Sequence, residues 1–154
     1  MGTQQLEPLR KRIRSLVNVE RRDMRWELGY FQVPMYVKDP AGEAPIKPYM
    51  LVCIDTASRA VMGNPLLRNV ASPEEFLSLL VSSMESPCLG EDGPVLPRSV
   101  HLDNAAALEL LEKELDQLDI EFELVKQLPF LREFAEITER EFFSRQAGYT
   151  GRKH

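Results

Sequence analysis

The sequence predicts an α/β domain in which a mixed sheet of about five strands, three antiparallel and then two parallel, is flanked by helices. The first observation is an apolar run from Tyr49 to Ile54, a polar corner from Asp55 to Ser58 and a second apolar run, which together indicate a β-hairpin. The second is that strand-like and helix-like stretches alternate after this hairpin. Sequential antiparallel strands followed by crossover helices are typical of a mixed sheet covered by helices.

Residues 4–17 predict an amphipathic helix with an apolar stripe and a basic opposite face. The stripe consists of Leu6, Leu9, Ile13, Leu16 and Val17. Three interpretations are open: a helix packed on the body, a helix that docks on a partner, or a helix on a membrane surface. The stripe is short and lacks aromatic anchors, which favours docking within the fold or in a dimer.

The segment from Trp26 to Val37 predicts a strand that is interrupted at Pro34, with Trp26, Leu28 and Tyr30 on one side. Residues 38–48 contain four glycines and prolines and predict a loop. The first arm of the following hairpin is apolar on both sides, as in an interior strand that is covered on both faces.

The second half of the chain carries clear helix signals. Ser72, Pro73 and Glu75 form the pattern of a capping box, and the helix that they start is expected to end at Pro87. A loop over 87–97 leads to a strand over 99–102, and Asp103 and Asn104 are expected to cap the next helix. A strand over 120–124 and a helix from 129 to about 143 complete the order.

The length of 154 residues fits one domain with a core of its own. We divide the chain into a basic helix over 1–22, the sheet domain over 23–143 and a flexible tail over 144–154. No run approaches the roughly 20 apolar residues of a membrane span. Cys53 and Cys88 show no metal-ligand spacing, so free thiols and a cytoplasmic protein are expected.

The net charge of −5 is unevenly distributed. Residues 1–25 hold seven basic and three acidic side chains, which leaves −9 for the rest of the chain. An acidic body makes nucleic acid an unfavourable partner, because neutralising phosphates requires a cationic surface. A protein partner or self-association is therefore expected, with the arm as the docking element and four candidate binding residues: Arg10, Lys11, Arg12 and Arg14.

Four stretches carry a resemblance to a known family. MLVCIDTASRAVMG, SPEEFLSLLVSSM, PRSVHLDN and LDIEFELV, in this order, resemble the retroviral-type integrase core, which has a ribonuclease H-like fold. The resemblance spans about residues 26–143, although each motif is short. The whole chain is also similar to an uncharacterised bacterial family of small domains with acidic bodies.

The resemblance implies three carboxylates that hold two Mg²⁺ or Mn²⁺ ions for phosphoryl transfer. The first position falls on Gly29 in Trp26-Glu27-Leu28-Gly29, where no carboxylate is available. The second falls on Asp103 and the third on Glu139, although a helix cap for Asp103 and a solvated surface position for Glu139 are the favoured explanations. Asp55 cannot replace the missing ligand, because its strand runs in the opposite direction to the strand before Asp103.

Two functional hypotheses follow. The first is a non-catalytic ribonuclease H-like module for binding or assembly, without metal or cofactor. The alternative is a nuclease or transposase-type enzyme that depends on Mg²⁺ or Mn²⁺ and uses Asp103, Glu139 and a third, unidentified ligand. His101, alone in an apolar strand, is expected to be a packed and hydrogen-bonded side chain.

Overall fold

The computed structural model describes residues 3–38, 42, 44–89 and 93–151. Parts of the predicted loops and of the tail, at positions 39–41, 43, 90–92 and 152–154, lie outside the described residues. The helices are α1 (Thr3–Arg14), α2 (Pro73–Glu85), α3 (Ala105–Glu114), the short 3₁₀ helix η1 (Asp116–Leu118) and α4 (Pro129–Gly151). The strands are β1 (Arg21–Gln32), β2 (Tyr49–Asp55), β3 (Val61–Gly63), β4 (Leu66–Leu67), β5 (Leu96–Leu102) and β6 (Glu121–Leu124).

The described strands form one mixed sheet with the order β3-β2-β1-β5-β6, and the short β4 also pairs with β2. β1 runs antiparallel to β2 and parallel to β5, which in turn runs parallel to β6. The predicted α/β class, with antiparallel strands followed by parallel ones, is therefore confirmed. The sheet has six strands rather than five because Leu66 and Leu67 continue the edge beside β2 after β3.

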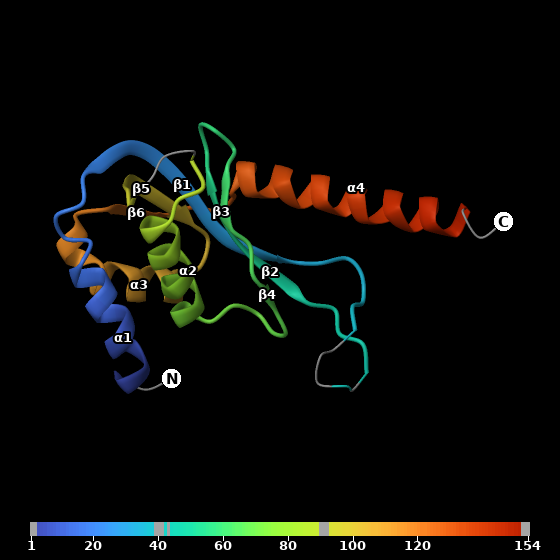
Figure 1. Cartoon of the computed structure of the whole chain (residues 1–154), viewed down its shortest axis with the longest axis horizontal. Helices are drawn as coiled ribbons and strands as arrows, with labels where there is room; N and C mark the ends of the chain where they lie inside the picture. The colour runs from blue at the N-terminus through green and yellow to red at the C-terminus, as the bar shows by residue number, and fades with distance from the viewer. Residues whose placement is uncertain (1–2, 39–41, 43, 90–92, 152–154) are drawn as a thin grey trace.

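Helices cover both faces of the sheet (Figure 1). One apolar core joins α1, α2 and α3 to the face of β1 that carries Trp26 and Leu28, both fully buried. A second core joins α4 to the opposite face of the sheet, which carries Val52 of β2 and Val33, the residue that follows β1. β2 is thus buried on both sides, as its uninterrupted apolar sequence predicts. The distal part of α4 extends away from the other helices (Figure 1).

The local helix signals have the predicted effect. The Ser72 hydroxyl accepts a hydrogen bond from the backbone N–H of Glu75, whose side chain accepts one from the N–H of Ser72. Pro73 occupies the first turn, where its missing N–H costs nothing. The capping box therefore fixes the start of α2, and α2 carries Phe76 and Leu80 into the first core.

Some boundaries differ from those that the sequence predicts. β1 already begins at Arg21 because its backbone pairs with β5 from Leu96 onward, although the side chains of Arg21 and Arg22 are exposed. β5 begins at Leu96 rather than Ser99, and α4 continues to Gly151 rather than ending near residue 143. No helix in the described part of the chain combines the length and the apolar character that crossing a bilayer requires.

Candidate functional site

The carboxyl ends of β1 and β5 place Gly29 and Asp103 side by side. Leu28 of β1 is paired with Leu102 of β5, so the next residue of each strand lies at the same edge of the sheet. The Oδ1 atom of Asp103 lies 3.5 Å from the point that a β-carbon on Gly29 would occupy. A carboxylate at position 29 would consequently face Asp103 directly.

Leu128, immediately before α4, and Leu131, in the first turn of α4, fill this corner. The Cδ1 atoms of Leu128 and Leu131 lie 2.7 and 3.3 Å from the same β-carbon position of Gly29, and each residue is 6% exposed. A separation of 2.7 Å is shorter than two carbon atoms tolerate, so any side chain at position 29 has to displace Leu128. The place that a first metal-binding carboxylate would take is therefore packed with hydrocarbon.

Asp103 does not cap α3, although the sequence predicts that it would. Asn104 is the cap, and its Oδ1 atom accepts the backbone N–H of Ala107 at 3.0 Å. Asp103 is an exposed residue; partial loss of hydration raises the pKa of its carboxyl above the ordinary value, and the hydrogen bond from its own backbone N–H opposes this change.

Glu139 lies far from Asp103. Leu131 is beside the Asp103 corner, and Glu139 follows it by more than two turns of α4, about 12 Å along the axis at ~1.5 Å per residue. Its side chain is exposed. Paired catalytic metals lie about 4 Å apart, so the two candidate ligands do not share such a site. Within the described residues, no three His, Cys, Asp or Glu side chains are grouped so that they could hold a metal ion.

Glu27 is a buried acidic residue for which the sequence predicts no role. It is 1% exposed, and its Oε1 atom accepts the backbone N–H of Leu131 at 2.8 Å, in the first turn of α4. The first N–H groups of a helix have no partner within the helix, so Glu27 attaches α4 to the centre of the sheet. Burial raises the pKa of Glu27, although the hydrogen bonds from the N–H groups of Leu131 and Phe130 oppose this change. A glutamate within an apolar strand, on the same side as Gly29, was the available signal.

A polar row crosses the parallel strands beside Glu27. Glu27 is paired with His101, and His101 with Glu123, on β1, β5 and β6 respectively. His101 Nε2 lies 3.0 Å from Glu123 Oε2, so the histidine has a polar partner, with which it forms an ion pair when its imidazole is protonated. These three residues lie on the side of the sheet that carries Gly29.

Asp55 is the last residue of β2, at the polar corner that the sequence predicts between β2 and β3. The Oδ2 atom of Asp55 accepts two hydrogen bonds from Ser58, one from the backbone N–H at 2.9 Å and one from the hydroxyl at 2.6 Å. Asp55 pairs with Trp26 of β1, whose side chain packs in the first core, whereas Asp103 lies beside Gly29, against the α4 segment. Asp55 and Asp103 therefore do not form one site.

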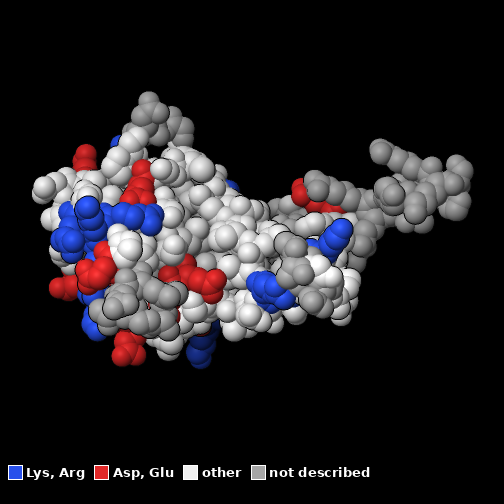
Figure 2. Space-filling model, turned by 60° about the horizontal axis from the view of Figure 1, so that its bottom comes forward, with Lys and Arg blue, Asp and Glu red and all other residues white. Residues whose placement is uncertain are grey.

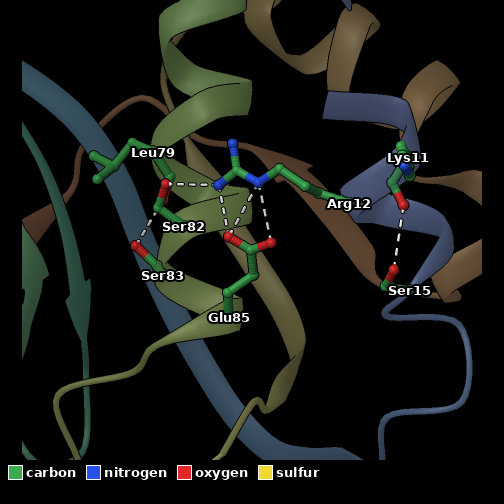
Figure 3. Close-up of polar contacts among 7 residues, drawn as sticks. All are labelled: Lys11, Arg12, Ser15, Leu79, Ser82, Ser83 and Glu85. Atoms are coloured by element: carbon green, nitrogen blue, oxygen red, sulfur yellow. Dashed lines mark hydrogen bonds and ion pairs between the residues drawn. The ribbon is translucent and has the colours of Figure 1, made fainter. Parts of the chain in front are cut away.

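The basic side chains of α1 have two different roles. Arg12 donates to both carboxylate oxygens of Glu85 and to the Ser82 hydroxyl of α2, as Figure 3 shows. Arg10 binds Glu114 of α3 and Glu7 of its own helix. These pairs fasten α1 to the acidic body, together with the buried Ile13 and Leu16. The interpretation of α1 as a helix packed on the body is thus confirmed.

Lys11 and Arg14 differ from the other two candidates. Both side chains are exposed, and neither has an ion pair among the described residues. In Figure 3 only the backbone oxygen of Lys11 takes part in a contact, with the Ser15 hydroxyl. Lys11 and Arg14 therefore remain available to a partner, whereas Arg10 and Arg12 serve the fold.

A double-mutant cycle on Arg12→Ala and Glu85→Ala is expected to give a coupling free energy of about 0.5–1 kcal/mol, the range for a partly exposed pair with good geometry. Urea unfolding of the four proteins measures it. The matched cycle of Lys11→Ala with Glu85→Ala should give a value near zero. Equal coupling in both cycles would mean that the net charge of α1, rather than the Arg12 contact, holds the helix.

Comparison with known proteins identifies a family for most of the chain. One protein-family model, described as a domain of unknown function (DUF6930), matches residues 12–137. The match begins within α1 and ends within α4, and so includes the corner formed by Gly29, Asp103 and the two leucines. A search of curated proteins finds no match. The chain thus belongs to the DUF6930 family of domains of unknown function.

Proposed function

We propose that this domain is a non-catalytic module for binding or assembly, built on a ribonuclease H-like sheet. The strand directions support this fold assignment, because β1, β2 and β3 are antiparallel while β5 and β6 run parallel to β1 and to each other. A helix on either face fits the same plan. The bacterial origin of the related domains is part of the proposal, as is a cytoplasmic location, which the free thiols of Cys53 and Cys88 support.

The observation that carries the non-catalytic assignment is the leucine packing at Gly29. An integrase-type site needs carboxylates that converge on two hydrated metal ions. Here Asp103 faces a glycine, and the adjacent volume holds the side chains of Leu128 and Leu131. A doubly charged ion in this place would lose its hydration without gaining a second carboxylate, which is strongly unfavourable.

The alternative, a metal-dependent nuclease or transposase-type enzyme, has one observation in its favour. Asp103 lies at the carboxyl end of β5 beside β1, where the second carboxylate of such a site is expected. The distance of Glu139 from this position counts against the alternative, because α4 would have to shift by about two turns to bring it close.

Thermal melting with added Mn²⁺ or Mg²⁺ separates the two proposals. We expect no rise of the midpoint at millimolar metal, because an ion that does not bind the folded state cannot stabilise it. Asp103→Asn is the matched control and should melt in the same way with and without metal. A midpoint that rises with metal in the wild type and not in Asp103→Asn would overturn the non-catalytic assignment.

The partner that we propose is a protein, or a second copy of this chain, rather than nucleic acid. Arg10 and Arg12 are already paired with carboxylates of the body, which reduces the charge that α1 can offer to a phosphate backbone. The outward-facing Lys11 and Arg14 are the binding residues that this proposal retains.

A further inference from the structure

α1 and α3 enclose a cleft at the end of the molecule where basic side chains gather. Figure 2 shows Lys and Arg atoms collected toward this end of the visible face, with carboxylates between them. The cleft has a volume of about 240 Å³. It is lined by Arg10, Ile13, Arg14, Lys113, Glu114 and Gln117.

The charges in the cleft do not cancel. The side chain of Glu114 is 6% exposed and is held by Arg10, with Nε to Oε1 at 2.7 Å and Nη2 to Oε2 at 3.0 Å. This pair lowers the pKa of Glu114, which keeps its negative charge committed to Arg10. Arg14 and Lys113 have no ion pair in the described part of the chain. Arg10 is shared between Glu114 and Glu7, whereas Arg14 and Lys113 have no such carboxylate partner among the described residues and are available to a ligand.

The size of the cleft and its surroundings restrict the ligand. The two available cations converge on one small volume, whereas a nucleic-acid backbone requires cations spread along a stripe. One or two carboxylate side chains fit the volume, and the amide of Gln117 adds a hydrogen-bond donor.

We propose that this cleft binds an acidic segment of a partner protein, with Arg14 and Lys113 contacting its carboxylates. The inference rests on the proposed function as a binding module and assigns it a partner of defined charge. A purely structural role competes with it, because both residues stand in the last turn of their helices, where cations stabilise the free carbonyl groups. Only the ligand role predicts binding.

Fluorescence anisotropy of a labelled peptide of about six glutamates, titrated with the full chain, tests the proposal. We expect saturable binding that weakens as salt is added, and no binding of the matched glutamine peptide. Arg14→Glu with Lys113→Glu should weaken the affinity by at least about tenfold, because both attractive contacts become repulsive. The control, Arg132→Glu with Arg140→Glu on α4, changes the net charge equally and should alter the affinity by less than about twofold.

NMR chemical-shift changes of the backbone amides in the wild-type protein give a second test of the binding site, and this test needs no variant. The peptide should perturb the amides of Ile13 and Gln117, and an adventitious charge effect should spread over all basic surfaces instead. Absence of binding at millimolar peptide, equal weakening in the α4 control, or preference for a single-stranded oligonucleotide or inorganic phosphate over the peptide would overturn the inference. These outcomes leave the metal-melting result unaffected, so failure here is distinguishable from failure of the non-catalytic assignment.

Discussion

Replacing Gly29 by aspartate is expected to lower the free energy of unfolding by about 3 kcal/mol or more, because the change overpacks a closed corner and adds a charge beside apolar groups. The new β-carbon would stand 2.7 Å from Leu128 Cδ1, and the new carboxylate would face Asp103 at short range. Chemical denaturation measures the loss. Addition of Mn²⁺ should not recover it, since the leucines still fill the space that a hydrated ion needs.

The controls for this variant separate overpacking from charge. Gly29→Ala adds only the β-carbon, and the end of the Leu128 side chain can move aside, so a cost of about 1–2 kcal/mol is expected. Adding Leu128→Ala to Gly29→Asp should not restore stability fully, because the charge repulsion with Asp103 remains. A stable Gly29→Asp protein whose midpoint rises with Mn²⁺ would mean that the corner is a dormant metal site.

Replacing Glu27 by alanine is expected to cost about 3 kcal/mol, because buried N–H groups at the start of α4 lose their acceptor. Glu27→Gln retains an acceptor oxygen for the N–H of Leu131 and should cost about 1 kcal/mol. Hydrogen exchange of the first turn of α4, together with urea unfolding, measures the effect. Equal losses in the two variants would show that the carboxylate charge of Glu27, rather than an acceptor oxygen for the N–H of Leu131, is what the side chain supplies.

The raised pKa of Glu27 also predicts how the stability of the protein changes with pH. Burial raises the pKa of Glu27 in the folded protein, so the folded state binds this proton more tightly than the unfolded state does. Its contribution to stability is complete below the ordinary pKa of 4.5 and is lost as the pH rises through the raised value. Glu27→Gln should remove this decline. A wild-type contribution that grows over the same interval would contradict the direction of the shift.

Much of the fold could be predicted because its signals are local. The Ser72–Glu75 capping box and the hairpin turn at Asp55 each depend on side chains that bond to a backbone three residues away. The two-sided burial of β2 follows from a run in which both parities are apolar. In these places the sequence neighbours are also the spatial neighbours, so periodicity and capping are sufficient.

The features that were missed depend on residues distant in sequence. The charged start of β1 at Arg21 has no alternating apolar pattern, and its strand conformation comes from backbone pairing with Leu96. Glu27 bonds to Leu131, 104 positions later, so its apolar neighbours in the sequence mark it as unusual but do not identify its partner. The distal part of α4 lacks a complete apolar stripe, so hydrophobic periodicity gives no signal for the helix beyond about residue 143.

The candidate site was predictable in part. Register placed Gly29 next to Asp103 because both follow paired residues on parallel strands, and this neighbourhood follows from the resemblance and the strand order. The filling of the corner by Leu128 and Leu131 was not predictable, since it depends on how α4 lies across β1. The charge asymmetry was visible in the sequence, but its structural use, which is fastening α1 through Arg10 and Arg12, required the ion-pair partners.

Paramagnetic broadening of backbone amide signals by Mn²⁺ tests the central claim most directly, because it reports proximity of the ion residue by residue. The account predicts that the amides of Gly29, Asp103 and Leu131 keep the same relative intensity as those of the first core while Mn²⁺ is added. Selective loss of these three signals at submillimolar Mn²⁺, absent in Asp103→Asn, would contradict it and establish a metal site at the leucine-filled corner.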